Sequence, residues 1–193
     1  MTETGICEEC GGAIKFHECV NLAHDEGSRV LCYACYNGFI SRRLEMDFEH
    51  PNFVPLSMED AAGMSHQFEF RTMLSANGLT IRAIERRDDG KEGHEVMVVG
   101  DPEGDSMFLF KRLLDKMGCE LRRKHVVDSD LGLQIGKDNV VRARITWDNR
   151  YEGMVPLVVI DGREVAWNEF GRMLMTFEGW KFKLEIFEPH EER

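Results

Sequence analysis

The residues best suited to chemistry are four cysteines near the start of the chain. They form two Cys-x2-Cys pairs, Cys7/Cys10 and Cys32/Cys35, with 21 residues between the pairs. Each pair presents two thiolates from one tight turn, and two pairs complete the tetrahedral sulfur site that zinc favours. Four cysteines also close the coordination shell and leave no position for a catalytic water. The spacing therefore predicts one structural Zn2+ held by Cys7, Cys10, Cys32 and Cys35.

Two other interpretations of this region stay open at the level of sequence. His17, Cys19 and His24 lie between the two pairs and could replace one of the ligands. A redox dithiol or a disulfide is the second alternative, although a single Cys-x2-Cys pair suffices for redox chemistry and two pairs at this spacing indicate a metal. A zinc deaminase is not indicated, because neither pair follows a proline and no His-x-Glu motif stands at the required spacing.

The cysteine region resembles known small zinc modules. The run CEECGG at residues 7–12 resembles the first knuckle of treble-clef or zinc-ribbon modules, and the second pair runs into a segment at residues 39–44 that looks helical. A knuckle that opens a helix favours the treble clef, because amides at a helix N-terminus stabilise the net charge of −2 on a Zn2+ with four thiolates. The long spacer requires its own hairpin, with residues 25–28 as its tip. The resemblance covers residues 7–45 and implies a metal and a fold but no activity.

Charge and composition limit the partners of the chain. The 193 residues carry a formal charge of −11, and the first 50 residues hold nine acidic and four basic side chains. An acidic surface repels phosphate backbones, so nucleic acid is a disfavoured partner. No apolar stretch approaches the roughly 20 residues of a membrane helix, and the first residues lack the pattern of a signal peptide. We therefore expect a cytoplasmic protein with no membrane association.

Proline positions and residue patterns divide the chain. Residues 1–48 are rich in cysteine and poor in aliphatic side chains, whereas regular periodicity begins after about residue 65. Pro51 and Pro55 block a helix between these parts, because proline lacks the amide donor and restricts the residue before it. The sequence predicts a zinc-binding module over residues 1–48, a linker over residues 49–62 and a second domain over residues 63–193.

The second domain alternates between strand and helix patterns. Period-two alternation and turn residues predict strands, and three- and four-residue spacing of apolar side chains predicts helices. The expected strands span residues 65–74, 79–87, 95–99, 141–147, 155–160 and 180–187. The first expected helix follows the capping pair Asp105/Ser106, and its apolar face consists of Met107, Phe110, Leu114, Met117 and Leu121. The second expected helix spans residues 167–177. This order predicts an α+β fold in which two helices cover a mainly antiparallel sheet of about six strands.

Other charged groups in the chain offer weaker candidates for function. Asp101, Glu103 and Asp105 could bind Mg2+ in a metal-dependent hydrolase, but the same residues suit a turn followed by a helix cap. The basic run Arg122–His125, together with Arg42 and Arg43, could contact nucleic acid in a zinc-finger regulator, but it also suits a solvated helix end. No phosphate-binding loop, nucleophile elbow or zinc-protease motif occurs in the chain.

Residues 65–188 are similar to uncharacterised bacterial proteins. The similarity is carried by the runs VVIDG at residues 158–162 and WNEFGRML at residues 167–174. That group has no assigned function, so the similarity implies none. With a closed metal site, acidic charge on both parts and no catalytic grouping, the sequence favours a non-enzymatic protein that binds another protein.

Overall fold

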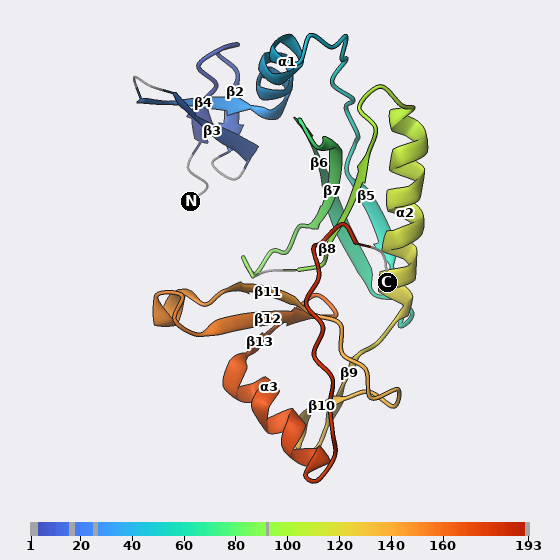
Figure 1. Ribbon diagram of the computed structural model, residues 1–193. Helices are drawn as coiled ribbons and strands as arrows, with labels where there is room; N and C mark the ends of the chain where they lie inside the picture. Colours follow the sequence, from blue (N-terminus) through green and yellow to red (C-terminus); the bar gives the residue numbers. More distant parts are fainter. Residues whose placement is uncertain (1–3, 16–17, 25–26, 92, 192–193) are drawn as a thin grey trace. The chain divides into compact units, whose positions relative to one another are not determined.

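The chain forms two compact units. The computed structural model describes residues 4–15, 18–24, 27–91 and 93–191 (Figure 1). The first unit comprises Met1–Val54, Phe70–Arg82 and Met97–Leu113, and the second comprises Pro55–Glu69, Ala83–Val96 and Leu114–Arg193. Strands and helices throughout confirm the α+β class. The division into residues 1–48, 49–62 and 63–193 stays a prediction.

Two small hairpins and one helix make up the N-terminal region. Strands β1 (Thr4–Ile6) and β2 (Ala13–Lys15) pair antiparallel, as do β3 (Cys19–His24) and β4 (Gly27–Cys32), and helix α1 (Tyr33–Arg43) follows directly. Ile14, Leu31 and Tyr36 are buried together with Cys7. The hairpin expected in the spacer is confirmed, and the residues of its tip, Asp25 and Glu26, lie outside the described part of the chain.

A four-stranded sheet follows, in the order β5-β6-β7-β8. Its strands are β5 (Leu56–Glu59), β6 (Ser65–Ser75), β7 (Gly78–Glu85) and β8 (Glu95–Gly100). The predicted meander is confirmed, but its first turn comprises Ala76 and Asn77, one position before the predicted pair, and Gly78 begins β7 with a φ of 130°. Strand β5 lies within the predicted linker. It directly follows Pro55 and pairs only with β6, so the edge position accommodates the proline.

Helix α2 (Ser106–Arg122) packs on this sheet through a stripe that differs from the expected one. The buried side chains are Leu109, Leu113, Met117 and Leu121, whereas Met107 is 62% exposed. Leu109 lies against Gly100 of β8, and the carbonyl of Leu121 accepts a hydrogen bond from the amide of Ala61. The predicted helix is confirmed, but its buried side chains recur every four residues and share only Met117 and Leu121 with the predicted apolar face. No helix among the described residues has the length and apolar character needed to cross a membrane.

The C-terminal part contains two further sheets and a short helix. Strands β9 (Val126–Ser129) and β10 (Gly132–Ile135) form a hairpin, and β11 (Arg144–Trp147), β12 (Pro156–Ile160) and β13 (Arg163–Ala166) form an antiparallel sheet. A 3-10 turn (Asn149–Tyr151) precedes β12, and α3 (Trp167–Leu174) continues into a second one (Met175–Phe177). Helix α3 packs on β10, β12 and β13, where Ile160, Val165 and Met173 are buried (Figure 1).

The strand predicted over residues 180–187 is wrong. This segment belongs to no helix or strand, and its apolar side chains are exposed: Trp180 by 68%, Phe182 by 80%, Leu184 by 73% and Ile186 by 75%. The alternation of apolar and polar residues meets the local requirement of a strand. A strand also needs a neighbour for its backbone hydrogen bonds, and no sheet among the described residues accepts this segment.

Candidate metal centre

The first cysteine pair sits in a tight turn between β1 and β2. The amide of Cys7 donates to the carbonyl of Gly12 (2.9 Å), and the amide of Gly11 donates to the carbonyl of Cys7 (2.9 Å). Gly11 has a φ of 71°, a left-handed conformation that glycine adopts without a steric cost. The turn brings the side chains of Cys7 and Cys10 to one side, which explains why glycine follows the second cysteine.

The second pair sits at the junction of β4 and α1. Cys32 is the last residue of β4 and the N-cap of α1, and its sulfur accepts a hydrogen bond from the amide of Cys35 (3.5 Å). Cys35 lies in the first helical turn. The expectation that the second pair opens a helix is therefore confirmed, and the amide of Cys35 in that turn faces the sulfur of Cys32.

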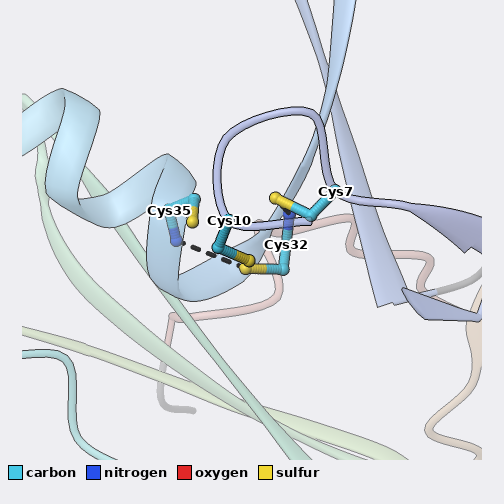
Figure 2. A group of neighbouring side chains, drawn as sticks. All are labelled: Cys7, Cys10, Cys32 and Cys35. Carbon is cyan, nitrogen blue, oxygen red and sulfur yellow. Dashed lines mark hydrogen bonds between the residues drawn. The ribbon is translucent and has the colours of Figure 1, made fainter. Parts of the chain in front are cut away.

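The four cysteines predicted as metal ligands come together at the start of α1 (Figure 2). Their Sγ atoms all lie within 4.8 Å of one another. Cys7 is buried, and its sulfur also accepts a hydrogen bond from the amide of Cys32 (3.3 Å). All six cysteines of the chain are free thiols. The arrangement brings two distant pairs into one group that could hold a metal ion.

The electrostatics of the group favour one thiolate and oppose a second. Burial disfavours the charged form of Cys7, but amide donors, first those of Cys10 and Cys32, outweigh it and lower the pKa of that thiol to about 6. Burial raises the pKa of Cys32 and of Cys35, and the neighbouring sulfur atoms raise that of Cys35 further. Cysteine binds a metal as the thiolate, and a bound divalent cation would offset the repulsion between neighbouring thiolates.

Cys19, one of the alternative ligands between the pairs, is not part of this group. Cys19 begins β3 and pairs with Cys32 in the strand register, but the group comprises the other four cysteines. The backbone of His24 ends β3 opposite Gly27. His17 lies outside the described residues. Cys119 is exposed on α2.

Helix α1 is fixed by Asn37, which is completely buried. Its side-chain nitrogen donates to the carbonyl of Thr72 (2.9 Å), and its side-chain oxygen accepts from the amide of Leu74 (2.8 Å), both in β6. The same nitrogen lies 2.8 Å from Nδ1 of His50. All of these residues belong to the first unit. Asn37 thereby links the helix that carries Cys35 to the sheet.

The contact with His50 predicts a dependence of stability on pH. An amide nitrogen only donates, so Nδ1 of His50 must accept and stay unprotonated. Burial lowers the pKa of His50 below its ordinary value, so the unfolded chain binds a proton at higher pH than the folded chain. The contribution of His50 is complete above about pH 6.5 and is lost as the pH falls through the folded pKa.

We therefore expect a His50→Gln variant to lose less stability than the wild type between pH 7 and pH 5. Denaturant unfolding at several pH values measures this difference. The pKa of His94 is also lowered, chiefly by burial, but this histidine is present in both proteins. The comparison therefore isolates His50, and equal slopes in the two proteins would show that it does not titrate as described.

The other candidate groups have structural partners. Asp101 and Asp105 accept hydrogen bonds from the amides of Glu103 (2.9 Å) and Met107 (2.8 Å), as a turn and a helix cap do. These carboxylates form no metal-binding group in the described part of the chain. In the basic run, Lys124 pairs with the buried Asp60 at 2.6 Å and His125 is itself buried.

Sequence reasoning missed a second group of side chains that could hold a metal ion. His66, Glu85 and His94 place one ligand atom each within 4.8 Å of one another. They are separated by 19 and nine positions and match no short motif. The strand alternation that places His66 on the same face as Phe68 was the available signal.

Three family models match successive parts of the chain. Each describes a domain of unknown function: DUF7685 over residues 6–47, DUF7686 over residues 49–122 and DUF7713 over residues 125–191. No curated protein and no solved structure matches the chain. These similarities carry no activity, so function has to be inferred from the geometry of the side chains.

Proposed function

We propose that Cys7, Cys10, Cys32 and Cys35 bind one structural zinc ion in a module of the treble-clef type. The observation that carries this proposal is the grouping of four sulfur atoms within 4.8 Å. A knuckle, a hairpin and a helix that begins at the second cysteine pair are the parts of such a module. Zinc is the metal that tetrahedral sulfur sites favour, and four protein ligands give it a structural role.

Titration with Co2+ tests the metal site directly. Thiolate ligands give cobalt an intense charge-transfer absorption, which imidazole and carboxylate ligands do not give. We expect this absorption to grow until one cobalt is bound per chain and to disappear when zinc is added, because zinc prefers tetrahedral thiolate sites. A reduced protein that develops no such absorption would contradict the proposal.

The proposed role of the whole chain is to bind another protein in the cytoplasm without catalysing a reaction. Support comes from Trp180, Phe182, Leu184 and Ile186, which are exposed and alternate with Lys181, Lys183 and Glu185. An extended segment of this pattern can pair with the free edge of a partner's sheet and place its apolar side chains in pockets. The net charge of −11 favours a protein partner over nucleic acid.

Paired substitutions test this contact surface. We expect full-length protein to capture specific proteins from a native lysate, and Phe182→Asp with Ile186→Asp to abolish the capture. Lys181→Ser with Lys183→Ser, on the opposite side of the same segment, should leave it unchanged. Quantitative mass spectrometry compares the captured proteins. Equal loss in both double variants, or no loss in either, would contradict strand pairing through the apolar side.

A further inference from the structure

His66, Glu85 and His94 form a compact polar cluster within the second unit. His66 lies near the start of β6, Glu85 is the last residue of β7, and His94 directly precedes β8. Nδ1 of His66 lies 2.7 Å from Oε1 of Glu85, and the two imidazole rings meet edge to face with centroids 5.3 Å apart. Adjacent strands therefore bring two imidazoles and one carboxylate together.

The carboxylate of Glu85 is held from two sides. Oε1 faces His66, and Oε2 accepts a hydrogen bond from the backbone amide of His94 (2.7 Å). The backbone amide of Glu85 in turn donates to the carbonyl of His94 (2.8 Å). This mutual bonding fixes the two residues relative to each other, which lowers the entropy cost of binding a ligand between them.

One nitrogen of the cluster is buried without a partner. His66 is 7% exposed, and its Nε2 forms no hydrogen bond with any described residue. The nearest acid, Asp60, places Oδ2 3.7 Å away, beyond hydrogen-bonding distance. Because Nδ1 faces Glu85, a metal that both residues ligate would replace the proton shared by Nδ1 and Oε1, while Nε2 would carry a proton on the side of Asp60.

The turn between β12 and β13 closes over the cluster. A Cβ on Gly162 would lie 2.5 Å from Cδ2 and 2.8 Å from Nε2 of His94, and 3.0 Å from Oε2 of Glu85. The carbonyl of Gly162 accepts a hydrogen bond from Arg87 (3.0 Å). Only a residue without a side chain lets the turn approach this closely, so Gly162 shapes one wall of the cluster.

The surrounding charges suit a cation. Lys124 pairs with Asp60 at 2.6 Å, and Arg87 pairs with Asp89 at 2.8 Å, so both basic side chains are matched by an acid. Glu85 adds a negative charge beyond these pairs. Asp161 adds a second negative charge, which opposes the lowering of the pKa of His94 by burial. Its Oδ2 accepts hydrogen bonds from the amides of His125 and Val126.

We propose that His66, Glu85 and His94 bind a divalent first-row transition metal at a second site, independent of the four cysteines. Two imidazoles and a carboxylate are ligands for zinc, iron(II) or cobalt(II) rather than for magnesium or calcium. Three protein ligands leave a coordination position for water or another small molecule. This open position distinguishes the second site from the closed cysteine site.

Cobalt binding to protein that already carries one zinc per chain tests the second site. We expect one further Co2+ per chain, with visible absorption bands but without thiolate charge transfer. Glu85→Gln and His94→Gln should each weaken this binding at least about tenfold, the lower end of what even an outer-sphere change costs. Far-UV circular dichroism checks that the variants fold. Absence of a second cobalt, or unchanged affinity in both folded variants, would overturn the proposal.

Gly162→Ala offers a test that leaves every ligand in place. The new methyl group should displace His94 and Glu85 and weaken cobalt binding about tenfold or more. Loss of an outer-shell residue that orients a metal ligand has an effect of this size. Gly90→Ala is the matched control, because Gly90 has the same φ of 69° but no atom within 4 Å of the added Cβ. Equal affinities in the two variants would show that the turn does not shape a metal site.

Discussion

Replacing Cys32 with serine is expected to abolish tetrathiolate metal binding and to unfold the N-terminal module. Cys32 supplies one ligand and caps α1, so its loss removes a metal–sulfur bond and a helix cap together. Structural zinc contributes on the order of 10 kcal/mol or more to the folding of small zinc modules. Among the described residues of the module, the apolar side chains buried beside Cys7 are Ile14, Leu31 and Tyr36, a small core that we expect to need its metal to fold.

Cobalt charge transfer and hydrogen exchange measure the two parts of this prediction. The absorption should vanish in Cys32→Ser, and amides of β3, β4 and α1 should lose their protection, while those of the second unit keep theirs. Cys119→Ser is the control, since Cys119 is an exposed cysteine on α2. A Cys32→Ser protein that keeps both the absorption and the protection would show that another residue completes the site.

Asn37→Ala is expected to lower the free energy of unfolding by about 3 kcal/mol or more. The substitution leaves the carbonyl of Thr72 and the amide of Leu74 without their partners in a buried position. Each unsatisfied buried group costs about 1–3 kcal/mol, and the contact with His50 is lost as well. Denaturant unfolding measures the change.

The control for this prediction is Asn168→Ala, because Asn168 is an exposed asparagine in the first turn of α3. A surface change of this kind alters stability by about 0.5 kcal/mol or less. Similar values for the two variants would mean that Asn37 does not fix α1 to β6. A large value for Asn37→Ala alone would show that the helix of the cysteine module and the sheet fold together.

Local patterns were sufficient to predict the cysteine group and most of the regular elements. The Cys-x2-Cys spacing predicted four residues that the fold brings together, and Asn77-Gly78 predicted the turn between β6 and β7 to within one position. These features depend on residues that are close in sequence or on a chemistry that allows few alternatives. The short strands β9, β10 and β13 were missed, because four residues with mixed exposure carry too little periodicity.

Features that depend on pairing between distant segments could not be predicted. Residues 180–187 alternate as a strand does, yet alternation cannot reveal whether a sheet has a free edge for them. Asn37 resembles any polar helical residue until β6 lies beside it. The cluster of His66, Glu85 and His94 likewise requires the order of the strands, which one sequence does not specify.

The most direct measurement of the central claim is the X-ray absorption spectrum of protein loaded with one zinc per chain. The four-cysteine site predicts a single shell of four sulfur atoms at about 2.3 Å from the metal. A shell of nitrogen and oxygen atoms at about 2.0–2.1 Å would contradict it. In that case the zinc would prefer His66, Glu85 and His94, and the cysteines would need another role.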